Sequence, residues 1–181
     1  LGEEASKRAL QRFLDLGGNL IDTAWVYGWH EDRPDSHPSE ELIGRFLAET
    51  HQRDKVILCS KIPPINQEWP AIEGATMKST FPSSFITKCV EDSLRSLKTD
   101  TIDIMYFHVW RDEFTDEDEW KKVCTRLTRE GKVKHWGLSP NYYTPDGCVK
   151  TLDEGFISVV QCIFNLYHQA PVEKLFPSLR K

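Results

Sequence analysis

Residues 19–28 read N-L-I-D-T-A-W-V-Y-G, and this stretch decides the fold. It begins as an apolar strand and ends in a polar turn that carries Asp22 and Tyr27. Three later stretches share the form of an apolar strand followed by a polar group: 56–61 with Lys61, 102–108 with His108, and 159–165 with Gln161. Strands whose C-terminal ends carry such groups are typical of the active sites of α/β barrels. We therefore predict that Asp22, Tyr27, Lys61 and His108 converge as a proton-transfer set.

Helical and strand patterns alternate along the whole chain. The predicted strands are 19–24, 56–61, 102–108, 134–139 and 158–165; the predicted helices are 3–16, after Ser39, after Ser83 or Ser84, from Thr115 to Gly131, from Pro145 to Gly155, and from Val172 to Lys181. Strict alternation indicates parallel strands joined by right-handed crossovers. No G-x-G-x-x-G motif follows a strand, so a nucleotide-binding Rossmann fold has no support. The predicted fold is an α/β barrel of the (β/α)8, or TIM barrel, type.

The number of predicted strands is lower than a closed barrel needs. Five strands can be recognised, whereas a barrel of this type has eight. We therefore expect residues 1–181 to form a single partial barrel domain that lacks the first strand and the last strands. A segment between Pro63 and Pro82 is expected to be a long loop, which is functional or mobile.

Composition excludes several classes of function. The chain has 181 residues and a net charge of −5, so an acidic surface disfavours nucleic acid. No apolar run approaches the roughly 20 residues that cross a membrane. The five cysteines form no C-x-x-C pair, which indicates reduced thiols in a cytoplasmic protein. No histidines and carboxylates have the spacing of a metal site, so no metal is expected.

The chain contains several sequence motifs, and their order, taken together, is a specific signal. They are D-T-A-x-x-Y-G at 22–28, S-E-E-L-I-G at 39–44, S-K at 60–61, F-H at 107–108, R-x-G-K-V-K-x-x-G-L-S at 129–139 and V-V-Q-C-I-F-N at 159–165. In these motifs the chain resembles the aldo-keto reductases across nearly its whole length. The tail at 165–177, N-L-Y-H-Q-A-P-V-E-K-L-F-P, resembles the bacterial-type branch of that family.

The resemblance implies reduction of an aldehyde, ketone or sugar-like carbonyl to an alcohol by hydride transfer. Tyr27 would be the general acid that protonates the carbonyl oxygen. Lys61 would stand beside Tyr27 and favour its phenolate, and Asp22 would hold Lys61 in place. His108 would donate a hydrogen bond to the substrate oxygen, where negative charge develops.

The resemblance also implies a nicotinamide cofactor. Ser139, Asn141 and Gln161 would hold its carboxamide, although Pro140 separates a serine and an asparagine that are adjacent in the family. NADPH is expected and NADH stays open, because the elements that bind the adenosine phosphate are absent from this sequence. Trp29, His30 and Trp110 follow the catalytic strands and are predicted to line the substrate pocket.

Two alternatives remain. The chain could be a non-catalytic subunit or fragment of this fold with a scaffolding or regulatory role, although such a role has no need of Lys61 beside Tyr27. A redox-neutral reaction on a sugar with retained cofactor is a third, weaker interpretation. The expected partners are a small-molecule carbonyl substrate and a second copy of the chain in a homo-oligomer, with neither nucleic acid nor a membrane.

Overall fold

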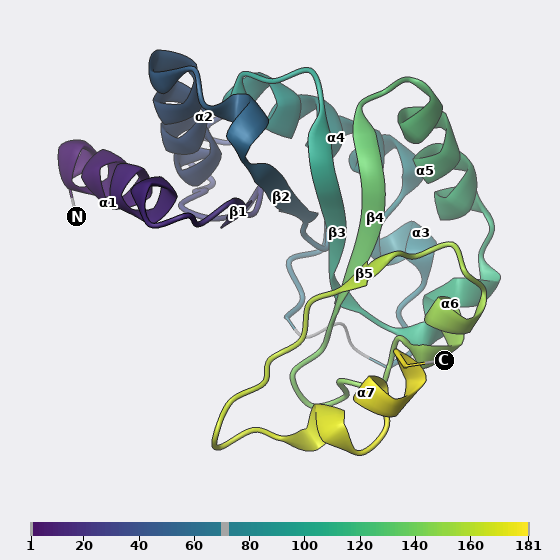
Figure 1. The fold of residues 1–181 in the computed structure, drawn as a ribbon. Helices are drawn as coiled ribbons and strands as arrows, with labels where there is room; N and C mark the ends of the chain where they lie inside the picture. Colours follow the sequence, from purple (N-terminus) through teal and green to yellow (C-terminus); the bar gives the residue numbers. More distant parts are fainter. Residues whose placement is uncertain (1, 70–72, 181) are drawn as a thin grey trace.

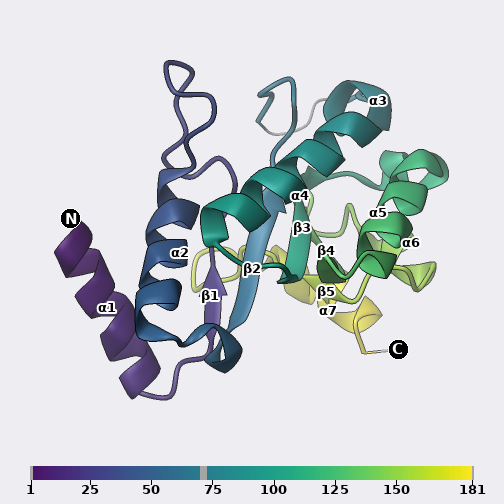
Figure 2. The same cartoon turned by 90° about the horizontal axis from the view of Figure 1, so that it is seen from above.

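A parallel sheet runs through the part of the chain that the structure describes, residues 2–69 and 73–180 of a computed structural model. Its strands are β1 (Leu20–Asp22), β2 (Ile57–Ile62), β3 (Ile102–Trp110), β4 (Val133–Pro140) and β5 (Val159–Val160). They lie side by side in chain order, and each neighbouring pair is parallel. The sheet curls, with helices along its outer face, as half of a barrel does (Figures 1 and 2). The predicted fold class is confirmed.

The helices alternate with the strands along the chain. They are α1 (Glu3–Asp15), α2 (Pro38–Thr50), α3 (Met77–Thr80), α4 (Ser83–Leu97), α5 (Glu119–Arg129), α6 (Val149–Asp153) and α7 (Leu175–Ser178), with the 3-10 turns η1 (Arg53–Lys55), η2 (Asp112–Asp116) and η3 (Ala170–Val172). Helices α2 and α4 pack backbone to backbone, because a Cβ atom at Gly44 would lie 2.3 Å from the carbonyl oxygen of Ser96. This close contact fixes α2 against α4.

Several boundaries differ from the prediction. Helix α5 begins at Glu119 rather than Thr115, because the side chains of Phe114 and Thr115 are buried in the 3-10 turn η2. Helix α6 is shorter than predicted and α2 begins at Pro38, before Ser39. Strand β5 covers only residues 159–160 of the predicted 158–165, and the predicted helix from Val172 is a pair of short turns. Lys181 and residues 70–72, within the predicted loop, lie outside the described residues.

Side chains of the sheet alternate between two buried layers. The outer layer packs against the helices and includes Leu58, Phe107 and Leu138. The inner layer is a small cluster of Cys59, Ile104 and Tyr106, with Val159 against it. Because successive strand residues point to opposite faces, the next inner positions after Cys59 and Tyr106 are Lys61 and His108. The alternation therefore brings both groups to one side of the sheet.

The outer layer also contains a buried carboxyl group. Glu40 of α2 is fully buried and accepts a hydrogen bond of 2.6 Å from Oγ of Ser60, on β2. Burial raises the pKa of Glu40 to about 7. The S-E-E-L-I-G motif thus places a titratable group directly behind the strand that carries Lys61.

The cysteines are free thiols, and four of the five are buried. Burial raises the pKa of Cys59 to about 11 and that of Cys148 to about 12. Within the described ranges, no helix is long and apolar enough to cross a membrane.

Candidate active site

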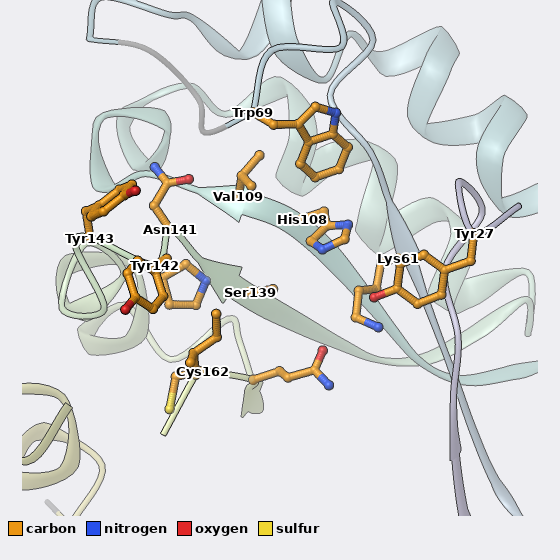
Figure 3. Close-up of a pocket in the computed structure, with 13 residues that line it drawn as sticks. Tyr27, Lys61, Trp69, His108, Val109, Ser139, Asn141, Tyr142, Tyr143 and Cys162 are labelled. Atoms are coloured by element: carbon orange, nitrogen blue, oxygen red, sulfur yellow. The ribbon is translucent and has the colours of Figure 1, made fainter. Parts of the chain in front are cut away.

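A cavity of about 530 Å³ opens at the C-terminal ends of the strands. Six of the predicted site residues line it: Tyr27, Lys61, His108, Ser139, Asn141 and Gln161. Figure 3 shows side chains from β2, β3 and β4 and from the loops after them turned toward this space. Groups that are up to 134 positions apart in the sequence therefore meet in one place, as the parallel topology predicts.

Lys61 is held at the end of β2 by two oxygen atoms, one from β1 and one from the residue that follows β1. Its Nζ atom lies 2.6 Å from Oδ2 of Asp22 and 2.8 Å from the carbonyl oxygen of Thr23. The lysine side chain is 3% exposed and the aspartate side chain 29% exposed. A buried ammonium is costly without a counter-charge. Asp22 supplies that charge, although it does not itself line the cavity.

Tyr27 stands over Lys61 at the end of the turn that follows β1. The Nζ atom of Lys61 lies 5.1 Å from the centroid of the Tyr27 ring. Gly28 ends this turn with φ of +78°, a conformation that glycine adopts without strain. The Tyr27 side chain is accessible, since the residue is 43% exposed. A phenol beside an ammonium, open to a ligand, is a suitable proton donor.

His108 lies at the end of β3, with its ring edge to face against Tyr27 and Trp69. The centroid distances are 6.3 Å and 4.8 Å, and the interplanar angles are 73° and 82°. Burial, with the nearby charge of Lys61, lowers the pKa of His108 to about 4. The imidazole is therefore neutral at physiological pH and offers one N–H donor and one acceptor nitrogen.

Two of the residues that line the cavity carry buried amide oxygens. Oδ1 of Asn141 and Oε1 of Gln161 have no hydrogen-bond partner among the described residues. Buried polar atoms are normally hydrogen-bonded, so these acceptors are available to a ligand that brings N–H groups. Ser139 also lines the cavity. Pro140 does not remove Asn141 from the cavity, because Asn141 is buried and lines it.

Some cavity residues could not be recognised in the sequence. They are Trp69, Val109, Pro140, Tyr142, Tyr143, Cys162 and Ile163. Trp69 comes from the predicted long loop, and the Tyr142–Tyr143 pair begins one residue beyond the end of β4. Aromatic residues just after a strand end are the signal that could have identified the tyrosine pair. No sequence pattern marks Val109.

Trp110 was predicted to line the substrate pocket, and this prediction is wrong. Its side chain is fully buried in the outer layer, and its Nε1 atom donates a 2.8 Å hydrogen bond to Oγ1 of Thr151. Regular alternation after His108 would have put residue 110 on the cavity side. A β-bulge between His108 and Trp110 shifts the register by one residue and turns the tryptophan into the core.

Trp29 and His30 do not line the cavity either. Trp29 stacks on Trp25 and donates from Nε1 to the carbonyl oxygen of Pro34. His30 is largely exposed, and its Nδ1 atom lies 3.2 Å from Oδ2 of Asp32. Both residues belong to the loop between β1 and α2, which makes its own contacts beside the cavity. The structure thus assigns them to that loop rather than to the cavity wall.

The sequence matches the family model "Aldo/keto reductase family" over residues 2–181. The chain belongs to the aldo-keto reductases. Among its curated relatives is an aryl-alcohol dehydrogenase [NADP(+)] of Phanerodontia chrysosporium, 32% identical over 142 residues, or 77% of this chain. An aldo-keto reductase of Bacillus subtilis is also 32% identical, over 137 residues and 76% of this chain.

Solved structures of aldo-keto reductases have the same fold as this chain. A putative aldo-keto reductase of Pseudomonas aeruginosa gives a TM-score of 0.71 with 26% identity, over 99% of this chain. A Klebsiella pneumoniae aldo/keto reductase in complex with NADP and acetate gives 0.70 with 25% identity, over 98% of it. The match covers 61% and 54% of those structures, and 35% and 37% of the two curated relatives. This aldo-keto reductase chain spans part of the length of the proteins that it matches.

Proposed function

We propose that residues 1–181 form the catalytic part of an NADPH-dependent reductase that converts an aldehyde or ketone to an alcohol. One observation carries the proposal: Tyr27, Lys61 and His108 line the same cavity as the amides of Asn141 and Gln161. Such a reduction requires a proton and a hydride; the first group of residues would supply the proton, and the amides would help to hold the cofactor that supplies the hydride. We take these residues to belong to a single partial barrel domain.

The proposed chemistry at the carbonyl oxygen uses two donors. Tyr27 gives its proton to the oxygen as the alcohol forms, and the ammonium of Lys61, 5.1 Å from the ring centroid, stabilises the phenolate left behind. His108 is neutral, so it donates an N–H to the same oxygen and stabilises the developing charge without competing for the proton. Asp22 fixes Lys61 through the 2.6 Å contact.

The cavity suits a nicotinamide. A carboxamide brings an NH₂ group, and Oδ1 of Asn141 and Oε1 of Gln161 are buried acceptors without partners among the described residues. Ser139 offers a hydroxyl beside them. The bound cofactor would supply the hydride. NADP(H) is favoured over NAD(H) because a curated relative is named for NADP(+) and solved relatives hold NADP and NADPH.

The cavity wall favours an aromatic carbonyl compound. Trp69, Tyr142 and Tyr143 line it, and Trp69 and Tyr143 are 42% and 77% exposed. Planar substrates gain from contact with such rings. The aryl-alcohol dehydrogenases of Phanerodontia chrysosporium and Pestalotiopsis microspora carry a matching substrate class in their names. We therefore propose an aryl aldehyde as the preferred substrate.

The experiment is an assay of NADPH oxidation with aromatic and aliphatic aldehydes of similar size. We compare the unaltered protein with Tyr27→Phe, and use Tyr143→Phe as the matched control, since it removes a cavity hydroxyl without a proposed role. Tyr27→Phe should lower kcat by about 10²- to 10⁴-fold. NADPH affinity, followed by tryptophan fluorescence, should stay within about twofold of the unaltered protein.

Two results would contradict the proposal. Substantial reductase activity in Tyr27→Phe would remove Tyr27 from its role as the proton donor. NADPH binding by the unaltered protein without turnover of any aldehyde would favour a non-catalytic, cofactor-binding chain. Equal rates with aromatic and aliphatic aldehydes would overturn the substrate class alone.

A further inference from the structure

His108 and Val109 are consecutive strand residues, yet both face the cavity. In a regular strand, neighbouring side chains point to opposite faces of the sheet. The residues on either side, Phe107 and Trp110, both point into the outer layer, where their ring centroids lie 5.2 Å apart. Two residues thus take the place on the inner face that regular alternation gives to one.

A β-bulge at Val109 produces this arrangement. His108 pairs with Ser139 and Trp110 pairs with Pro140, so Val109 is an extra residue without a partner in the ladder. Its φ is +59°, in the left-handed region. The other non-glycine residues with positive φ in the described ranges are His51, Gln67 and Lys98, which are not β-branched. A valine in this conformation is a marked outlier, since the branched side chain crowds the backbone.

The surrounding core imposes the bulge on this valine. Phe107 and Trp110 are both fully buried, and Trp110 is further tied to Thr151 by its hydrogen bond of 2.8 Å. Fixed ends on both sides leave the His108–Val109 segment no freedom to return to a regular strand. Strained conformations persist where the surrounding structure determines them, and they are concentrated at functional sites.

The His108 ring depends on packing for its orientation. Its Nδ1 atom is buried and has no hydrogen-bond partner among the described residues. The usual means of orienting a catalytic imidazole is a hydrogen bond to that second ring nitrogen. Here the ring makes edge contacts with Trp69 and Tyr27, and the strained residue Val109 follows it directly in the chain.

We propose that Val109 is a positioning residue for His108, an inference that rests on the proposed reductase function. Regular alternation already brings the imidazole to the inner face, and the bulge adds the valine side chain to the cavity wall beside it, where it restricts the ring to one orientation. Glycine would accept the left-handed backbone readily, as it does in bulges of this kind. The strained valine therefore contributes a side chain that glycine lacks.

The test compares Val109→Gly, Val109→Ala and Val109→Ile in the cofactor-bound protein. The ring nitrogens of His108 are followed by NMR and assigned with His108→Gln, and kcat and KM are measured for an aldehyde. In Val109→Gly and Val109→Ala we expect broadened or doubled ring signals and a loss of kcat of about 10- to 100-fold, with KM within about twofold. Val109→Ile should keep the single set of signals and most of the activity.

Lys98→Gly is the matched control, because it relieves a left-handed residue with φ of +52° at the C-terminus of α4, away from the cavity. It should raise the unfolding midpoint and leave the His108 signals and kcat unchanged. If Val109→Gly does not fold, the comparison of Val109→Ala with the unaltered protein tests the proposal. Unchanged ring signals, or an unchanged kcat, in the folded Val109 variants would overturn the proposal. If the unaltered protein reduces no carbonyl compound, the proposed reductase function is refuted instead. The NMR signals of the His108 ring still test whether Val109 positions that ring.

Discussion

The Nζ atom of Lys61 lies 2.6 Å from Oδ2 of Asp22, on the neighbouring strand of the sheet. The lysine side chain is almost completely buried, whereas the aspartate is partly open to solvent. Removing one partner of the pair therefore has a different consequence from removing the other. Removing the aspartate leaves a buried charge without a counter-charge, and removing the lysine leaves a carboxylate that water can reach.

Asp22→Asn should destabilise the fold more than Lys61→Met. We expect Asp22→Asn to lower the free energy of unfolding by roughly 3 kcal/mol, because it leaves the ammonium unpaired, and Lys61→Met to lower it by about 1 kcal/mol or less. Urea unfolding of both variants and of the double variant measures the difference. An equal loss in the two single variants would show that burial of Lys61 is not what makes Asp22 necessary.

His108 should remain neutral throughout the range in which free histidine titrates. Its pKa is lowered to about 4 by burial and by the charge of Lys61, so its ring shifts should not change between pH 5.5 and pH 8. In the unfolded chain this histidine has the ordinary pKa of about 6.5. As the pH falls from about 6.5 toward 4, the unfolded state therefore binds a proton that the folded state does not bind, and the free energy of unfolding decreases. In Lys61→Met the pKa should rise, because the second cause is removed. A ring that titrates near 6.5 in the unaltered protein contradicts this expectation.

Glu40 should make the protein less stable as the pH rises toward neutrality. Its pKa is raised from 4.5 to about 7 by burial, so between these values the folded state binds a proton that the unfolded state has released. The contribution of Glu40 to the free energy of unfolding is complete below about pH 4.5. It decreases as the pH rises through about 7, by up to about 3 kcal/mol. Urea unfolding of the unaltered protein and of Glu40→Gln at several pH values gives the difference. Parallel pH profiles would show that Glu40 does not titrate in this way.

Trp110 and Trp69 should respond differently to truncation, because one is in the core and the other is in the cavity wall. Trp110→Ala removes a fully buried side chain and should lower the free energy of unfolding by about 3–5 kcal/mol. Trp69→Ala should change stability by less than about 1 kcal/mol but weaken the preference for aromatic over aliphatic aldehydes. Thermal unfolding and the ratio of kcat/KM values measure the two effects. A selectivity change in a folded Trp110→Phe variant, with none in Trp69→Ala, would reverse the assignment.

The predictable part of the site follows from local patterns. Alternation of apolar strands and helices fixes a parallel sheet, and its topology places the strand ends together. Tyr27, Lys61 and His108 could therefore be brought to one cavity without coordinates. The prediction for Trp110 failed because it rested only on the place of this residue just after a catalytic strand, whereas the direction of its side chain depends on the period of two along β3. A bulge is an interruption of that period, and the letters F-H-V-W contain no glycine or proline to announce it.

The sequence by itself determined the order of the elements, the barrel type of the sheet and the residues that we propose for proton chemistry. Hydrophobic periodicity is a property of neighbouring residues, so it can be read along the chain. Only the tertiary structure decided which aromatic residues reach the cavity, that Glu40 lies buried behind β2, and that Val109 interrupts β3. These features depend on contacts between distant segments, such as Trp110 with Thr151, and long-range packing overrides the local pattern where the two conflict.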